Sequence, residues 1–248
     1  MTKVAVVTGA AGGIGFATGV RLLQAGHTVY FTDRKSTNLD TIDGALKVRA
    51  HAAMLDLADP AQIEQVMKDI WAKHGRVDIL VNNAGITIKG KDGKPQGILD
   101  AQEDQFFEIM RINVLAMMQM TQFVLPGMMA NKWGRIVNVA SLAGRSKSIV
   151  SGPLYMMSKS AVLGLTRCTA AEMGPYGITC NAVAPGRVLS PMTDKAAPGV
   201  NEGYAEQIPV RRIGEPDEVA GAIAYLCSNT AGFTSGAVID INGGFFMS

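Results

Sequence analysis

An α/β fold built on a doubly wound parallel β-sheet is predicted by three features of the sequence. Short runs rich in β-branched residues alternate with longer helical patterns along the whole chain, and this alternation produces right-handed βαβ units. The short runs are apolar throughout, which is typical of strands buried on both faces. Irregular stretches follow strands at 86–100, 143–153 and 186–209, so we expect them at the carboxyl edge of the sheet, where such folds bind ligands.

Seven strands and five main helices are expected in alternation. The predicted strands are 3–8, 28–32, 48–55, 78–83, 134–141, 177–184 and 236–242. The predicted helices lie near 13–25, 60–74, 103–130, 155–173 and 215–228. The helix at 60–74 has the clearest boundaries, because Asp59 can cap its N-terminus, Pro60 suits its first turn and Gly75 suits its end. No linker or repeat interrupts the pattern, so residues 1–248 are expected to form one domain.

The charge and cysteine content argue against several classes of function. The chain has 23 Lys and Arg against 21 Asp and Glu, a net charge of +2, which gives no reason to expect nucleic acid or an anionic membrane as a partner. The three cysteines are isolated and the three histidines show no ligand spacing, so neither a disulfide framework nor a metal site is expected. No apolar run approaches the ~20 residues of a membrane span. We therefore expect a soluble, cytoplasmic protein.

A glycine-rich turn follows the first predicted strand. In TGAAGGIG (8–15), Gly9, Gly13 and Gly15 would allow a tight turn and the close approach of a pyrophosphate to backbone N–H groups at a helix N-terminus. Asp33 ends the second strand, where a carboxylate can accept hydrogen bonds from the hydroxyls of an adenosine ribose. These features indicate a dinucleotide site, the alternative being a packing turn beside a solvated aspartate.

The stretch YMMSK places Tyr155 and Lys159 four positions apart. In a helix both side chains lie on one face, and a nearby cation favours the phenolate and lowers the pKa of a phenol toward the working range. The pair therefore suggests acid–base catalysis. Pairs at this spacing are common, so the motif alone also fits a packed tyrosine beside a solvated lysine.

Six short motifs occur together along the chain. They are TGAAGGIG (8–15), NNAG (82–85), INV (112–114), NVAS (138–141), YMMSK (155–159) and NAVAPG (181–186). In this order and spacing the chain resembles the short-chain dehydrogenase/reductase family, from residue 3 to the terminal IDINGG (239–244). The resemblance implies a Rossmann-type sheet of seven parallel strands in the order 3-2-1-4-5-6-7, with hydride transfer to or from a nicotinamide cofactor.

The resemblance also assigns the catalytic residues. These are Asn113, Ser141, Tyr155 and Lys159. Ser141 would orient the substrate oxygen, and Tyr155 would give or take its proton. Lys159 would lower the pKa of the phenol and hold the nicotinamide ribose, while Asn113 would anchor a water that relays protons to Lys159. A hydroxyl and an acidified phenol would stabilise the negative charge that develops on oxygen during hydride transfer.

Cofactor contacts follow from the same resemblance. The implied residues are Gly9, Gly13, Ile14, Gly15, Asp33, Asp56, Leu57, Asn83, Gly85, Tyr155, Lys159 and Val188. Asp56 would bind the adenine, and Asn83 would line the adenosine ribose and stabilise the fourth strand. Val188 would contact the nicotinamide carboxamide through its backbone.

NAD is expected rather than NADP. The Asp33 carboxylate would lie where NADP carries its 2′-phosphate, and two anions repel, whereas a ribose hydroxyl donates a hydrogen bond. Arg34 and Lys35 follow directly and count against this choice, because a guanidinium there could pair with a phosphate. We weigh the carboxylate more heavily, since Asp33 ends the strand.

The expected function is the interconversion of a secondary alcohol and a ketone with NAD(H). An NADPH-dependent 3-oxoacyl-thioester (ACP) reductase is the alternative, and a non-catalytic dinucleotide-binding scaffold is a remote one. A sugar-nucleotide epimerase or dehydratase is disfavoured, because those enzymes need a larger carboxyl-terminal substrate region. Arg145 and Arg187 lie close in sequence to the catalytic motifs and are candidates for binding an anionic substrate group, although solvated arginines are the alternative. The apolar helices at 105–130 and 155–173 predict a homotetramer.

Overall fold

A computed structural model describes residues 2–90, 95–146, 151–190 and 199–247. All seven strands that it contains pair in parallel in one sheet of order β3-β2-β1-β4-β5-β6-β7. The strands are β1 (Val4–Thr8), β2 (Thr28–Asp33), β3 (Ala50–Met54), β4 (Ile79–Asn82), β5 (Gly134–Val139), β6 (Ile178–Pro185) and β7 (Val238–Ile241). The predicted α/β fold and the strand order implied by the family resemblance are both confirmed.

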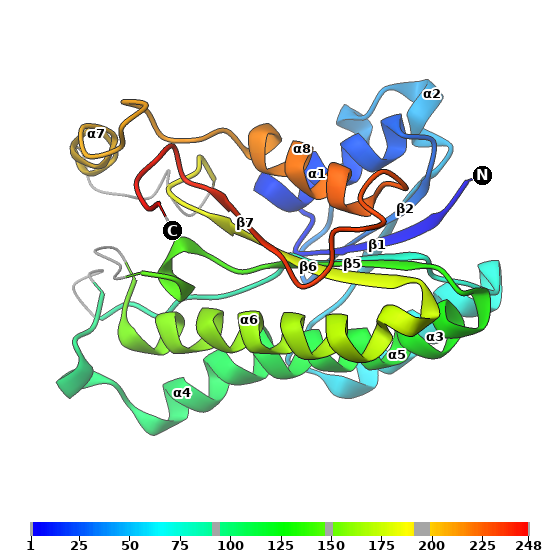
Figure 1. Ribbon diagram of the computed structural model, residues 1–248, viewed down its shortest axis with the longest axis horizontal. Helices are drawn as coiled ribbons and strands as arrows, with labels where there is room; N and C mark the ends of the chain where they lie inside the picture. The colour runs from blue at the N-terminus through cyan, green and yellow to red at the C-terminus, as the bar shows by residue number, and fades with distance from the viewer. Residues whose placement is uncertain (1, 91–94, 147–150, 191–198, 248) are drawn as a thin grey trace.

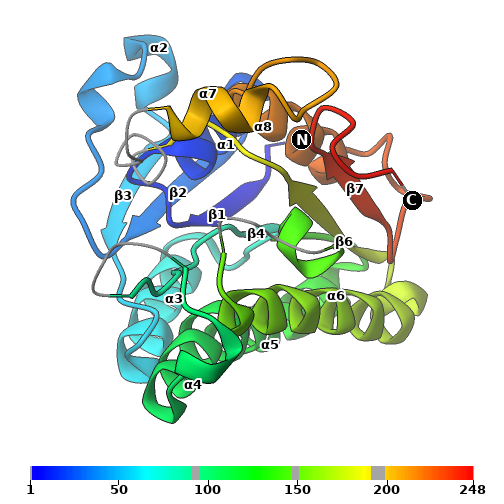
Figure 2. The same ribbon diagram turned by 90° about the vertical axis from the view of Figure 1, so that its left-hand side faces the viewer.

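Helices cover both faces of this sheet, as Figure 1 shows. On one face lie α1 (Gly13–Gln24) and α8 (Pro216–Cys227), with the short α2 (Gly44–Lys47) and α7 (Val200–Ala205) on the same side. On the other face lie α3 (Pro60–His74), α4 (Glu103–Met110), α5 (Ala116–Asn131) and α6 (Pro153–Met173). Figure 2 gives the turned view, with α4, α5 and α6 together beneath the sheet.

The boundaries of α3 arise from the residues that predicted them. The Asp59 carboxylate accepts hydrogen bonds from the backbone N–H groups of Ala61 and Gln62, at 2.9 and 3.3 Å. Pro60 occupies the first turn, and Gly75 ends the helix in the left-handed conformation, which glycine adopts at little cost.

The expected uninterrupted helix near 103–130 is wrong in one respect. A π-helical turn, Arg111–Leu115, separates α4 from α5. An apolar pattern does not reveal such a turn, because one extra residue in a helical turn leaves the composition unchanged. π-Turns are frequent at functional sites, and this one carries the predicted catalytic residue Asn113.

Apolar cores on both faces of the sheet explain why its central strands are hydrophobic. Alternate residues of β1 point to opposite faces, so Ala5 and Val7 join the core under α1 and α8, whereas Val4 and Val6 join the core under α3 and α5. The central strands are therefore buried on both sides, and the sheet's polar groups can be reached from the two edges where the strands begin and end.

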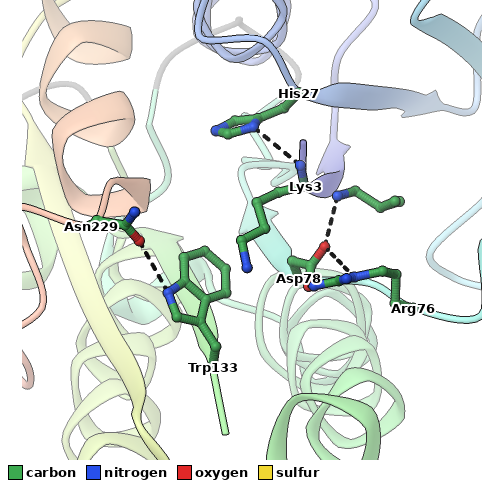
Figure 3. A network of polar contacts seen from close by, with 7 residues as sticks. Lys3, His27, Arg76, Asp78, Trp133 and Asn229 are labelled. Carbon is green, nitrogen blue, oxygen red and sulfur yellow. Dashed lines mark hydrogen bonds and ion pairs between the residues drawn. The ribbon is translucent and has the colours of Figure 1, made fainter. Parts of the chain in front are cut away.

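The amino edge of the sheet carries a network of paired polar groups (Figure 3). The Asp78 carboxylate, 1% exposed, accepts hydrogen bonds from the Val4 backbone N–H at 2.9 Å and from Arg76 Nε at 2.8 Å. Beside it, Lys3 Nζ lies 3.7 Å from the centroid of the Trp133 ring. These contacts tie the start of β1 to the segments before β4 and β5.

Candidate active site

The glycine-rich turn leaves no room for side chains at two of its positions. Gly9 has φ +66°, and a Cβ atom there would lie 2.8 Å from Ala84 Cα. A Cβ on Gly15 would lie 2.4 Å from the Gly9 carbonyl oxygen. The amide of Asn83 holds the turn from β4 by donating to the carbonyls of Thr8 and Gly9, at 2.9 and 3.0 Å. These glycines therefore let the turn pack tightly against the start of the segment after β4, as a dinucleotide-binding turn requires.

A cavity of about 470 Å³ adjoins this turn, and we name it the glycine-turn cavity. Its lining includes most of the predicted cofactor residues, namely Gly9, Gly13, Ile14, Asp33, Asp56, Leu57, Asn83 and Gly85. Gly15 does not line it and instead lets α1 pack against Gly9. The residues present therefore fit a nicotinamide dinucleotide.

Asp33 is fixed at the end of β2 by backbone donors. Its Oδ2 accepts from the Ala11 N–H at 3.1 Å and its Oδ1 from the Lys35 N–H at 3.0 Å. The carboxylate thus stands beside the glycine-rich turn as predicted. Arg34 and Lys35 also line the glycine-turn cavity, so the residues that could oppose the NAD preference are present in the same place.

A second cavity, of about 250 Å³, is lined by three of the four predicted catalytic residues, and we name it the catalytic cavity. Ser141, Tyr155, Lys159 and Val188 line it. It shares further lining residues with the glycine-turn cavity, namely Ile14, Asn83, Gly85 and Ser190. The two cavities therefore adjoin along the carboxyl edge of the sheet, which faces the viewer in Figure 2.

Tyr155 and Lys159 lie one turn apart on α6, which begins at Pro153. Lys159 Nζ donates to the Val139 carbonyl at 2.7 Å and lies 5.7 Å from the centroid of the Tyr155 ring. Burial raises the pKa of Tyr155, and a hydrogen bond with Ser141 lowers it by a smaller amount. The sequence predicted only the lowering of this pKa by Lys159, because it could not show how deeply the phenol is buried.

Lys159 is itself strongly affected by its surroundings. It is 2% exposed, and burial lowers the pKa of its ammonium from 10.5 to about 8. At neutral pH the side chain still carries its proton. The structure therefore places a buried cation beside the phenol, a costly arrangement that is typical of functional sites.

Asn113 lies behind the catalytic cavity and does not line it. Its Oδ1 accepts from the Ile86 N–H at 2.8 Å, and its Nδ2 donates to the Ile86 carbonyl and to Ser158 Oγ, each at 3.0 Å. A Cβ on Gly85 would lie 3.2 Å from Lys159 Nζ and 3.3 Å from Asn113 Oδ1. Only a glycine leaves the space between these two groups open. The proton-relay role of Asn113 stays a prediction.

Ser158 is a buried residue that sequence reasoning missed. Its hydroxyl accepts from Asn113 and donates to the Tyr155 carbonyl at 2.8 Å, so it joins the π-helical turn to the catalytic helix. The only available signal was its position within YMMSK, directly before Lys159.

The two candidate substrate arginines lie in different surroundings. Arg187 lines the catalytic cavity together with Tyr204 of α7. Arg145 is not among the described lining residues. Its Nε lies 3.4 Å from Asp240 Oδ1, and its guanidinium carbon lies 5.3 Å from the centroid of the Phe246 ring. Parts of the predicted irregular stretches, 91–94, 147–150 and 191–198, fall outside the described residues.

The fold and the site are those of a dinucleotide-binding protein, and they place the buried Lys159 beside the partly buried Tyr155. A family model described as "Enoyl-(Acyl carrier protein) reductase" matches residues 9–246. The chain belongs to the short-chain dehydrogenase/reductase family and is an oxidoreductase that acts on CH–OH groups. Among the described residues, no helix is both long and apolar enough to cross a membrane.

Three full-length relatives share the name 3-oxoacyl-[acyl-carrier-protein] reductase FabG. The Aquifex aeolicus protein is 36% identical over 98% of this chain and 97% of its own length. The Thermotoga maritima protein is 36% identical over 99% of this chain and 98% of its own length. The Escherichia coli protein is 33% identical over 99% and 98% of the two chains, respectively.

Proposed function

We propose that the protein interconverts a secondary alcohol and a ketone with NAD(H), and that Tyr155 exchanges the proton of the substrate oxygen. One observation carries this proposal. Ser141, Tyr155 and Lys159 line a cavity that adjoins the glycine-turn cavity, which contains Asp33. When bound, the nicotinamide cofactor would supply or accept the hydride.

The described side chains have the properties that ketone reduction requires. A carbonyl oxygen gains negative charge as it is reduced, and the hydroxyls of Ser141 and Tyr155 can donate hydrogen bonds to it. Because burial raises the pKa of Tyr155, the phenol keeps its proton at neutral pH and can donate it. The Lys159 ammonium would stabilise the phenolate that remains. In the oxidation direction the same phenolate would accept the alcohol proton.

A 3-oxoacyl thioester is the second candidate substrate, and the names of the relatives favour it over an unspecified alcohol or ketone. Its reduction at C3 is also the conversion of a ketone to a secondary alcohol, so it would use the same groups. A purely dinucleotide-binding scaffold is disfavoured, because all four predicted catalytic residues are present and interconnected or share one cavity.

The decisive test uses the Tyr155→Phe variant. It should bind NADH with nearly wild-type affinity and lose at least about 99% of kcat on a panel of ketones and 3-oxoacyl thioesters, because only the proton donor is removed. Substrate turnover is followed by NADH absorbance, and cofactor affinity by NADH fluorescence. Retention of more than a few per cent of kcat would exclude Tyr155 as the acid–base group.

The preference for NAD rests on Asp33. Replacing this carboxylate should relax the preference, because the repulsion of a 2′-phosphate is removed. The measurement is kcat/KM with NADH and NADPH for the wild type and for Asp33→Ala. A wild type that prefers NADPH, or a ratio that Asp33→Ala leaves unmoved, would assign the selection to Arg34 and Lys35 instead.

We also propose that the chain forms one domain and assembles as a homotetramer. All described strands belong to one sheet. On the face covered by α4 and α6, Phe107 is 60% and Met157 43% exposed, and association would remove such side chains from water. Light scattering at micromolar concentration should give the mass of four chains, and a monomer would exclude this assembly.

A further inference from the structure

We propose that Arg187 selects a ketone or alcohol substrate that carries a small anion, a carboxylate or a sulfonate, close to the reacting carbon. This inference rests on the proposed function and defines its substrate class. It separates Arg187 from Arg145, which the sequence presents as equivalent candidates.

The charge of the catalytic cavity is one-sided. Its described lining includes Lys89, Lys159 and Arg187 but no aspartate or glutamate. Lys159 donates to the Val139 carbonyl and lies beside the Tyr155 ring, and Lys89 is exposed. Arg187 is therefore the cation that is both partly buried and unassigned to the chemistry. An anion bound in this cavity would meet positive charge and no described carboxylate.

The partners of Arg187 are neutral. Its Nε and Nη2 donate to Asn201 Oδ1 at 3.1 and 2.8 Å, and its guanidinium carbon lies 5.7 Å from the centroid of the Tyr204 ring. Burial lowers the pKa of this guanidinium, which reports the cost of removing it from water. Such a cost is offset when the charge meets an anion. Among the described residues no carboxylate is within ion-pair distance of Arg187, so a ligand can provide this compensation.

The side chain is held in place instead of moving freely in solvent. The Arg187 carbonyl accepts from the Gly214 N–H at 2.9 Å, which fixes the backbone beside β6. Tyr204 stacks on Phe245 with ring centroids 5.2 Å apart and planes 12° apart, so helix α7 is supported by the segment that follows β7. A preorganised guanidinium loses little entropy on binding, and its planar donors suit carboxylate and sulfonate oxygens.

Arg145 provides the contrast within the same chain. Its guanidinium pairs with the Asp240 carboxylate and also lies near the ring of Phe246. Its charge is thus balanced by the protein itself, away from the described lining of the catalytic cavity. The two arginines have similar sequence positions relative to the motifs, but Arg145 has a carboxylate partner whereas the partners of Arg187 are neutral. Arg145 is therefore a matched control.

Cofactor phosphate is the competing use of Arg187. The lining of the glycine-turn cavity does not include Arg187, whereas the catalytic cavity combines it with Ser141 and Tyr155. The position therefore favours the substrate, and NADH affinity distinguishes the two uses directly. A neutral thioester carbonyl could accept a hydrogen bond from the guanidinium, but it would leave the charge uncompensated.

The test compares anionic ketones with neutral counterparts. The probes are 3-oxobutanoate against its methyl ester and its N-acetylcysteamine thioester, and 2-oxopropanesulfonate against butanone. The variants are Arg187→Met, Arg187→Lys and the control Arg145→Met. We expect the wild type to prefer the anionic member of at least one set by about 100-fold in kcat/KM, as charge-assisted bidentate hydrogen bonds imply.

Arg187→Met should remove most of this preference through KM, because kcat/KM falls far more for the anionic probes than for the neutral ones, while NADH affinity stays within about threefold of wild type. Arg187→Lys should recover part of it, and Arg145→Met should leave it unchanged. A wild type that prefers the neutral ester or thioester would overturn the proposal, as would equal losses on both members of a set or a matching loss of NADH affinity. Absence of turnover on every probe by a wild type that binds NADH would overturn the proposed function together with this inference.

Discussion

Buried charged groups have different surroundings at the two edges of the sheet: they are paired at the amino edge and, within the described lining of the catalytic cavity, lack an opposite charge at the carboxyl edge. At the amino edge the Asp78 carboxylate accepts hydrogen bonds from Val4 and Arg76 (Figure 3). The cations of Lys3 and Arg135 lie 3.7 and 4.6 Å from the centroid of the Trp133 ring. At the carboxyl edge the buried ammonium of Lys159 and the partly buried phenol of Tyr155 share a cavity whose described lining holds no carboxylate.

This difference shows how one fold divides stability from function. Lowering the pKa of Lys159 from 10.5 to about 8 corresponds to about 3 kcal/mol of destabilisation at neutral pH. A cost of this size is a sizeable fraction of the total stability of a domain. The apolar cores and the paired groups at the amino edge offset it, and the paired groups do so without touching the site. Changes at the two edges should therefore separate stability from activity.

The largest effect is expected at Asp78. Asp78→Ala leaves the Val4 N–H without its partner and removes the carboxylate from Arg76, so the free energy of unfolding should fall by about 3–5 kcal/mol. The kcat at temperatures where the variant is folded should stay near wild type, because the catalytic cavity lies at the opposite edge. Urea unfolding measures the loss.

Asp217→Ala is the matched control for Asp78→Ala. Asp217 pairs with Arg21 at 2.5 Å, but its side chain is 63% exposed, and exposed ion pairs contribute at most about 1 kcal/mol. Equal losses in the two variants, or a large fall in kcat for Asp78→Ala, would contradict the division between the edges.

The pH dependence of Lys159 should be smaller but has a definite sign. Its folded pKa, about 8, lies below the unfolded value, so between the two values the unfolded chain binds more protons. The free energy of unfolding of the wild type should therefore rise with pH across this window, by about 1 kcal/mol from pH 7 to pH 9 relative to Lys159→Met. The variant should be inactive at every pH.

Urea unfolding of both proteins at several pH values tests this prediction. Lys68→Met serves as the control, because the Lys68 side chain is 61% exposed and its surroundings change little on unfolding. Its difference from wild type should stay constant over the same range. A difference between wild type and Lys159→Met that stays constant, or that changes in the opposite direction, would exclude a buried ammonium at Lys159.

The sequence predicted those parts of the molecule that depend on neighbours along the chain. The ends of α3 follow from Asp59, Pro60 and Gly75, and the strands are found because most of their residues are apolar. The motifs also placed Asp33 and Tyr155 at the carboxyl edge. The strand order came from the family resemblance, since apolar runs alone do not specify which strands pair.

Other features depend on residues far apart in sequence and could not be predicted. The partner of Arg145 is Asp240, and the support of Tyr204 is Phe245. No local pattern indicates that one arginine is paired and the other faces a cavity. The raised pKa of Tyr155 likewise reflects burial by several elements. The π-helical turn at Asn113 was not predicted, because it is held by hydrogen bonds to Ile86 and Ser158 and leaves no mark in its own composition.

The smallest predicted effect concerns Trp133, where the amino edge uses a ring instead of a carboxylate to hold cations. Trp133 Nε1 donates to Asn229 Oδ1 at 3.2 Å, and Lys3 and Arg135 lie against the ring. Trp133→Phe keeps an aromatic face but loses the donor, so unfolding should become easier by about 0.5–1.5 kcal/mol. Trp133→Leu loses the face as well and should cost more. The chain contains two tryptophans, and Trp71 remains as a fluorescent reporter in both variants. Equal losses of unfolding free energy in Trp133→Phe and Trp133→Leu would show that the ring does not stabilise the two cations. A larger loss in Trp133→Leu, with kcat unchanged in both variants, would show that the ring stabilises the fold at the edge that takes no part in the chemistry.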